Sequence, residues 1–254
     1  MIPTAYGQSY LGHARAMLEE LKRAGDDLRA IRDNQAGQLS VGVTPVVSSL
    51  VPSAICALRH ERANVRVLVH NNRLAILMPE LLSGQLDMII GPINPEEIVP
   101  PIEAETLFSS TLEFIVARDH PLARMKGIKL EDIMSAPNVI LPPTSVFRRR
   151  DLDRLFQNAG LGKLIAAVET TSLSMIRALL LEEHWICVLP ESSFRADIMA
   201  NVMVKLDLGD AMAPTRRHTG VIFHKSRPLS VTAREMRRHL RILTSGSGHH
   251  NIAS

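Results

Sequence analysis

The feature that most constrains this chain is an alternation of strand-like and helix-like hydrophobic patterns that starts near Gln38. Short apolar runs predict strands, and the segments between them space their apolar residues along one face of a helix. These elements, in strand-helix-strand-helix-strand order, are 39–43, 46–60, 65–70, 71–85 and 87–91. The order predicts a parallel sheet with right-handed crossovers. Pro79 is expected to kink or restart the second helix.

A second series of the same kind follows a strand predicted at 111–118. Its predicted strands are 138–142, 164–170, 185–190 and 202–208. Its predicted helices are 130–135, 145–160, 172–184 and 191–201. A strand at 218–224 and a helix at 229–243 close the chain. Two separate series predict an α/β protein with two lobes and not one continuous sheet.

A long helix is predicted ahead of the first strand, over residues 9–35. Its apolar residues follow a heptad pattern on two seven-residue spacings, Leu11, Leu18, Gly25 and Ala14, Leu21, Leu28. A long, otherwise charged helix with so narrow an apolar stripe is expected to pack against a copy of itself. The alternative is a peripheral helix that lies on its own domain. Gly37 is placed to end this helix as a C-cap.

Charge and cysteine content narrow the class of protein. With 29 basic and 26 acidic residues the net charge is only +3, and so small an excess does not by itself support tight phosphate binding. The arginine cluster 148–150 is expected to lie on a solvated helix face. Cys56 and Cys187 each sit in an apolar run and are expected to be buried small hydrophobes, which fits a reducing compartment.

Neither a membrane span nor an export signal is expected. No apolar run approaches the length that crosses a bilayer, and the first residues lack the charged and apolar regions of a signal peptide. The protein is therefore expected to be cytoplasmic, with no membrane partner. The small polar tail at 246–254 is expected to be disordered.

The usual motifs for catalysis, cofactors and metals do not occur in the sequence. It has no glycine-rich phosphate loop, no G-x-S-x-G elbow, no H-E-x-x-H and no C-x-x-C pair. The histidines lack ligand spacing, and no nucleophile has an adjacent base. Asp87 and Glu169 stand at strand ends, where each is expected to be a cap or a rim contact. We therefore expect a binding protein with no catalytic residues, no cofactor and no metal.

Hydroxyl side chains gather in the turns that follow the predicted strands. In open parallel sheets, ligands bind beyond the carboxyl ends of the strands, where helix N-termini attract anions. Three serines in these turns are explained as helix N-caps, but Thr44 and Thr144 are not needed for capping. The turns therefore predict a site for a small polar or anionic molecule, with Val46 and Phe147 as apolar walls.

The order of short motifs resembles a known family. The pieces are HARAMLEEL, GQLSVGV, LLSGQLDMIIG, EFIVARDHPLA, LEDIMSAPNVILPP, AGL, VETTSLSMIRALLL and VLPES. Together, and in this order, they resemble a LysR-type transcriptional regulator from its linker helix through its effector-binding domain. GVTPVV and VILPPTSVFRR resemble the branch of regulators of sugar-binding-protein genes and protocatechuate catabolism. The chain departs from a frequent G-x-G pair before VLP, where it has Glu183 and Trp185.

The resemblance implies a two-lobed, periplasmic-binding-protein-like (type II) effector-binding domain that is preceded by a linker helix. The expected divisions are a dimerisation helix at 1–36, lobe 1 at 37–116 and 219–245, lobe 2 at 117–218, and the tail at 246–254. Hinge crossings are expected near Ala117 and Thr219. The winged helix-turn-helix of the family is missing from this sequence, so contact with DNA is expected only through that domain.

The implied function is effector sensing and oligomerisation within a regulator, and not an enzymatic activity. An aromatic acid, a sugar or a sugar acid is expected to bind between the lobes, and a second copy of the chain is expected as a partner in a dimer or tetramer. The residues expected to bind the effector are Thr44, Val46, Ser48, Thr144, Ser145, Phe147 and Thr171. The alternative is a solute-binding protein of a transport system, which the leading helix and the lack of a signal peptide disfavour.

Overall fold

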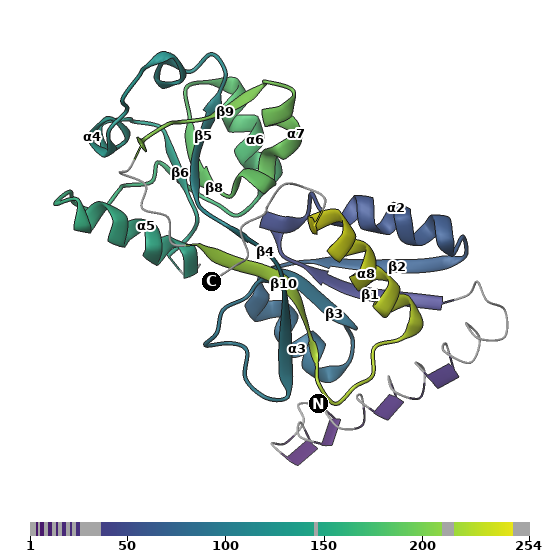
Figure 1. The fold of residues 1–254 in the computed structure, drawn as a ribbon. Helices are drawn as coiled ribbons and strands as arrows, with labels where there is room; N and C mark the ends of the chain where they lie inside the picture. Colours follow the sequence, from purple (N-terminus) through teal and green to yellow (C-terminus); the bar gives the residue numbers. More distant parts are fainter. Residues whose placement is uncertain are drawn as a thin grey trace. The chain divides into compact units, whose positions relative to one another are not determined.

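The computed structural model of the chain divides into two compact units, which Figure 1 colours along the sequence. Unit 1 contains residues up to Ser109 and from His218 onward, and unit 2 contains Ser110–Arg217. The chain therefore passes between the units twice. The structure describes residues 37–144, 147–209 and 216–245, without the side chains of Phe147 and Arg148, and positions 4, 6, 7, 10, 11, 14, 17, 18, 21, 24 and 25 near the start.

Within the described residues, unit 1 is built on a five-stranded sheet with the order β2-β1-β3-β10-β4. Its strands are β1 (Gly37–Val43), β2 (Val65–Asn71), β3 (Met88–Pro92), β4 (Ile102–Ser110) and β10 (Arg217–His224). The predicted parallel arrangement holds for β1 with β2 and for β1 with β3. The sheet as a whole is mixed, because β10 returns antiparallel to β3.

Helices cover both faces of this sheet. They are the 3₁₀ turn η1 (Pro45–Val47), α2 (Val51–Glu61), α3 (Leu74–Ser83) and α8 (Val231–Ser245). Alternate residues of β3 face opposite sides, so Met88 and Ile90 pack with α2 and α8 whereas Ile89 packs with α3. Figure 1 shows α2 and α8 side by side on one face. The sequence pattern therefore builds a three-layer unit with an apolar core on each side of the sheet.

Unit 2 repeats this plan, and in its described part five strands have the order β7-β6-β8-β5-β9. The strands are β5 (Glu113–Ala117), β6 (Val139–Leu141), β7 (Val168–Glu169), β8 (Ile186–Leu189) and β9 (Met203–Lys205). The helical segments are η2 (Pro121–Arg124), α4 (Leu130–Met134), α5 (Phe147–Asn158), α6 (Leu173–Glu182), η3 (Glu191–Phe194) and α7 (Arg195–Met199). β6 is parallel to β7 and β8, whereas β5 is antiparallel to β8 and β9.

Apolar side chains from β5, β6, β8, α4 and α5 form one core of unit 2. The rings of Phe114 and Phe156 meet edge to face in this core, with centroids 6.3 Å apart. His120 is also buried, and its Nδ1 accepts a hydrogen bond from the backbone N–H of Leu122 (3.1 Å). Burial lowers the pKa of His120, and the nearby His184 ring lowers it further.

The boundary between the units differs from the expected one. The strand 113–117 was expected in lobe 1, but β5 pairs with β8 and β9 in the sheet of unit 2. The first crossing therefore falls after Ser109, and the second falls after Arg217, close to the expected Thr219. The tail at 246–254 lies outside the described residues, as does most of the segment 1–36.

Other expectations also need correction. The helix predicted over 46–60 starts at Val51, because η1 and a turn occupy the residues before it. The strand β4 was not predicted at all. Cys56 is exposed on α2, and only Cys187 is buried. Arg149, expected on a solvated helix face, is buried.

One glycine of β10 has a steric role in the sheet of unit 1. A Cβ atom at Gly220 would lie 1.9 Å from the carbonyl oxygen of Glu105 on β4. No side chain fits at that distance, so β10 and β4 approach this closely only because Gly220 has none.

Candidate functional site

The turns at the carboxyl ends of parallel strands form the candidate site in each unit. In unit 1, β1, β2 and β3 are parallel, so the turns that follow them leave the sheet at one edge. β10 is antiparallel to β3 and begins at the same edge, where Thr219 pairs with Pro92. The turn after β1 holds Thr44, Val46 and Ser48, three of the residues expected to bind the effector.

Thr44 is the most unusual residue of this edge. Its backbone N–H donates to the carbonyl oxygen of Ile90 on β3 (3.0 Å), and its own carbonyl accepts from the N–H of Val47 (3.1 Å). The residue is only 4% exposed, yet its Oγ1 has no hydrogen-bond partner among the described residues. The side chain lies over Gly91, where a Cβ would approach the Thr44 methyl to 2.8 Å. The glycine therefore makes room for a buried hydroxyl that the fold leaves unsatisfied.

The other two candidate residues of this turn, Val46 and Ser48, make contacts within unit 1. Val46 is half-buried and packs against the core between the sheet and helices α2 and α8. The hydroxyl of Ser48 donates to the carbonyl oxygen of Pro45 (2.8 Å). Ser48 was explained as an N-cap of the following helix, but the N-cap position of α2 is Leu50. Ser48 therefore closes η1 and keeps only acceptor capacity for a ligand.

In unit 2 the structure brings Thr144 and Thr171 onto neighbouring turns. Leu141, the last residue of β6, pairs with Glu169, the last residue of β7. The backbone N–H of Thr170 then donates to the carbonyl oxygen of Leu141 (3.1 Å), which ties the two turns together. Thr144 is exposed and Thr171 is half-buried. Ser145 and the side chain of Phe147, both expected in the site, lie outside the described residues.

The hydroxyls just before α6 serve local capping. Ser172 Oγ accepts from the backbone N–H of Met175 (3.4 Å), as expected for an N-cap. Thr170 Oγ1 accepts from the backbone N–H of Ser172 (3.1 Å). Thr170 and Ser172 therefore use their hydroxyls for capping, which leaves that of Thr171 as the candidate contact in this turn.

Further polar residues at these edges were not selected from the sequence. In unit 1, Asn94 and Thr219 are buried at the ends of β3 and β10. In unit 2, Ser192 and Ser193 are buried in η3, which follows β8. The signal for the serines was present in the sequence as a pair of hydroxyls that follows a predicted strand with only Glu191 between. Thr219 carried no such signal, because it lies near the beginning and not after the end of its strand, β10, which is antiparallel to β3.

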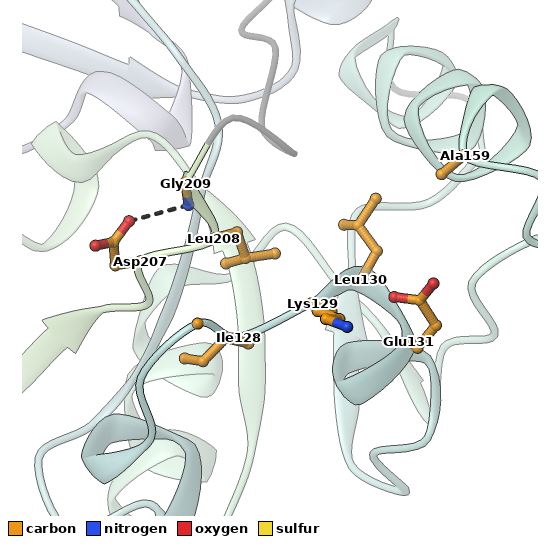
Figure 2. A pocket seen from close by; sticks show the side chains of 9 residues that line it. Ile128, Lys129, Leu130, Glu131, Ala159, Asp207, Leu208 and Gly209 are labelled. Atoms are coloured by element: carbon orange, nitrogen blue, oxygen red, sulfur yellow. Dashed lines mark hydrogen bonds between the residues drawn. The ribbon is translucent and has the colours of Figure 1, made fainter.

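A surface hollow of about 440 Å³ lies elsewhere in unit 2. Figure 2 shows it lined by residues 127–131, Ala159 and 207–209, none of which was expected to bind an effector. A hydrogen bond from the N–H of Gly209 to Asp207 Oδ1 (3.0 Å) joins two of these lining residues. Across the described ranges, no group of three or more His, Cys, Asp and Glu residues is placed to hold a metal ion. Nor does any helix in them have the length and apolar character to cross a membrane.

The two α/β units, joined by two crossings, define a class of ligand-binding fold. The structure matches the crystal structure of CbnR, a LysR family transcriptional regulator, with a TM-score of 0.66 over 95% of this chain and 81% of that chain. Sequence identity in this match is 23%, so the likeness concerns the fold. Residues 32–243 match the family described as LysR substrate binding domain, and the chain belongs to this family.

Characterised relatives are transcriptional regulators. The chain is 27% identical over 221 residues to the HTH-type transcriptional regulator GalR of Pseudomonas putida, across 87% of this chain and 55% of GalR. It is 25% identical over 235 residues to the HTH-type transcriptional regulator PcaQ of Agrobacterium fabrum, across 91% of this chain and 75% of PcaQ. The chain is thus the effector-binding domain of a LysR-type regulator and not an enzyme.

Proposed function

We propose that the strand-end turns of both units bind one small polar or anionic effector. The direct contacts are the hydroxyls of Thr44, Ser48, Ser145 and Thr171, and Val46 and Phe147 supply apolar contact. Thr144 is the remaining residue of the proposed effector site. Binding favours one arrangement of the units over another, and this preference is what the regulator transmits.

The unsatisfied hydroxyl of Thr44 is the observation that carries this proposal. Burying a hydroxyl without a hydrogen bond costs roughly 1–3 kcal/mol, so such groups are rare in folded proteins unless a ligand uses them. Thr44 stands at the carboxyl end of β1, where ligands of open α/β sheets bind. A bound effector oxygen or nitrogen would supply the missing partner and recover this cost.

The chemistry of the turns favours an effector with several hydrogen-bonding groups. The contacts on Thr44, Ser48 and Thr171 are neutral hydroxyls; those of Thr44 and Thr171 can donate or accept, whereas that of Ser48, which donates to Pro45, can only accept. The helix N-termini of α5 and α6 add partial positive charge and favour an anionic substituent. An aromatic acid, a sugar or a sugar acid meets these requirements.

A thermal-shift screen of aromatic acids, sugars and sugar acids tests this function. A compound that binds the folded state raises the melting temperature by mass action. Calorimetry on each hit should then show weaker binding to Thr44→Val than to the wild type, with Thr244→Val as a control at a bonded hydroxyl far along α8. Equal affinity for all three proteins would remove Thr44 from the site.

We also propose that the N-terminal helix pairs with a second copy of the chain. At the positions the structure describes, Leu11, Leu18 and Leu21 are helical and expose apolar surface. Glutamate at Leu21 and Leu28 would place charges in the proposed seam and should shift the protein toward smaller species in sedimentation velocity. An unchanged sedimentation coefficient would favour a peripheral helix instead. In the whole regulator, this assembly would present DNA-binding domains to the operator.

A further inference from the structure

Arg149 is a buried cation in the first turns of α5, and its side chain is only 7% exposed. Its Nε donates to Asp153 Oδ1 on the same helix (3.0 Å). Its Nη1 donates to the carbonyl oxygen of Pro142 (3.2 Å) and to Glu169 Oε1 (3.0 Å). Its Nη2 donates to the carbonyl oxygen of Leu164 (3.3 Å). One guanidinium group thus contacts four separate points of unit 2.

Two of these contacts belong to the turns assigned to the effector. Pro142 opens the turn that leads to Thr144, and Glu169 is the last residue before the turn that holds Thr171. A single nitrogen, Nη1, donates to both. We propose that Arg149 is a positioning residue that fixes the separation of these two turns, and so the distance between their hydroxyls. The role rests on the effector function proposed above.

The planar fork of arginine suits this task. Its N–H groups point in fixed directions, whereas a lysine ammonium is a single point with no fork. Asp153 and Glu169 compensate the buried charge, and charge-assisted hydrogen bonds are stronger than neutral ones. Removal of the guanidinium would leave two carbonyl oxygens and two carboxylates without their donor, so only backbone contacts such as the Thr170–Leu141 hydrogen bond would hold the turns, and the turns should move more.

Arg149 acts on an effector through the turns and not by direct contact. The four hydrogen bonds use four of the five N–H donors of the guanidinium. The local charge is one cation between two carboxylates, so an anionic effector would meet no uncompensated positive charge here. Arg149 therefore fixes the geometry of the hydroxyls, and the hydroxyls make the contacts.

Hydrogen–deuterium exchange on the ligand-free protein tests this role without any effector. The variants are Arg149→Lys, which keeps the charge but loses the fork, and Arg149→Met, which keeps only an apolar stem. The control is Arg154→Lys, at an exposed arginine of the same helix. Pro142 and Pro143 have no amide hydrogen, and the amide of Thr144 has no hydrogen bond among the described residues. The reporters are therefore the amide of Thr170, which bonds to Leu141 across the two turns, and the amide of Ser172, which bonds to Thr170 Oγ1.

Exchange at the bonded amides of Thr170 and Ser172 should be roughly tenfold faster or more in both Arg149 variants, because charge-assisted hydrogen bonds that hold the turns are lost. Amides of β8 in the same sheet should exchange at the wild-type rate, as should all amides of the control. Exchange that rises equally over the whole of unit 2 would mean that Arg149 only stabilises the fold. Wild-type exchange at the turns in Arg149→Lys would show that the charge alone suffices, and would overturn the proposal.

Glu169→Ala, which removes the acceptor of Arg149 Nη1 on the second turn, keeps the test decisive if the Arg149 variants do not fold. In this variant Arg149 retains its bonds to Pro142 and Leu164, so only the amides of Thr170 and Ser172 should exchange faster. No change at these residues would overturn the proposal. The exchange experiment and the compound screen can fail independently. If exchange at the turns is faster in the variants but no compound binds in the screen, the effector site is refuted, whereas the role of Arg149 in the turns stands.

Discussion

Replacement of Thr44 by valine should change stability and binding in opposite directions. Valine has nearly the shape of threonine, and the methyl that replaces Oγ1 faces Gly91, which has no side chain. The substitution removes a buried hydroxyl that has no partner within the described structure. Since such a group costs roughly 1–3 kcal/mol, the ligand-free variant should gain about 1 kcal/mol in free energy of unfolding. An effector that bonds to this hydroxyl should lose about 1 kcal/mol, or roughly fivefold in Kd.

Urea denaturation of the ligand-free proteins measures the first half of this prediction. Thr244→Val is the matched control, because Thr244 is also buried but its hydroxyl donates to the carbonyl oxygen of Leu240 (2.9 Å). The control should lose about 1 kcal/mol, since a hydrogen bond is removed. If Thr44→Val loses as much as the control, the Thr44 hydroxyl is already satisfied in the folded protein. The reasoning that assigns it to an effector would then fail.

Three further predictions concern the fold. The pKa of His120 is lowered in the folded protein. The stability that its neutral ring contributes is therefore complete above pH about 6.5 and is lost as the pH falls through the lowered pKa. Between pH 7 and 5, His120→Asn should lose less free energy of unfolding than the wild type does, as measured by urea denaturation at each pH. Burial raises the pKa of the Cys187 thiol, so a thiol reagent should label Cys56 in the native protein and Cys187 only after unfolding; native labelling of both, read by mass spectrometry, would contradict this. Gly220→Ala should cost about 2 kcal/mol or more, because its Cβ would meet the backbone of β4, whereas Gly162→Ala, with its nearest atom at 3.5 Å, should melt close to the wild type.

The sequence predicted those parts of the fold that depend on local hydrophobic patterns. Both series of strands and helices, and the turns after β1, β6 and β7, could be placed from periodicity alone. The strand β4 was missed because its glutamates break the apolar pattern, and it becomes a strand only through pairing with β10, far along the chain. The boundary at β5 was misplaced for the same reason, since sheet membership depends on distant partners.

Single residues were harder to predict than elements. Arg149 is buried and bonded to four groups, although it is one of three consecutive arginines at 148–150. The sequence alone does not distinguish it from the other two. Cys56 lies in an apolar run, but its side chain is on the exposed face of α2. Adjacent helix positions differ in burial, so an apolar run does not show which of its residues is buried. The unsatisfied hydroxyl of Thr44 could not be foreseen, because satisfaction of a polar group depends on every atom that surrounds it.

The position of β10 sets an order in which the chain can fold as it is synthesised. β10 lies between β3 and β4 in the sheet of unit 1, yet it is made after all of unit 2. Until residues 217–224 emerge, β3 has an open edge and β4 has no strand to pair with. Unit 2 is one continuous segment and can complete its sheet first, because domains fold as units during synthesis. The sheet that presents Thr44 is therefore the last to close.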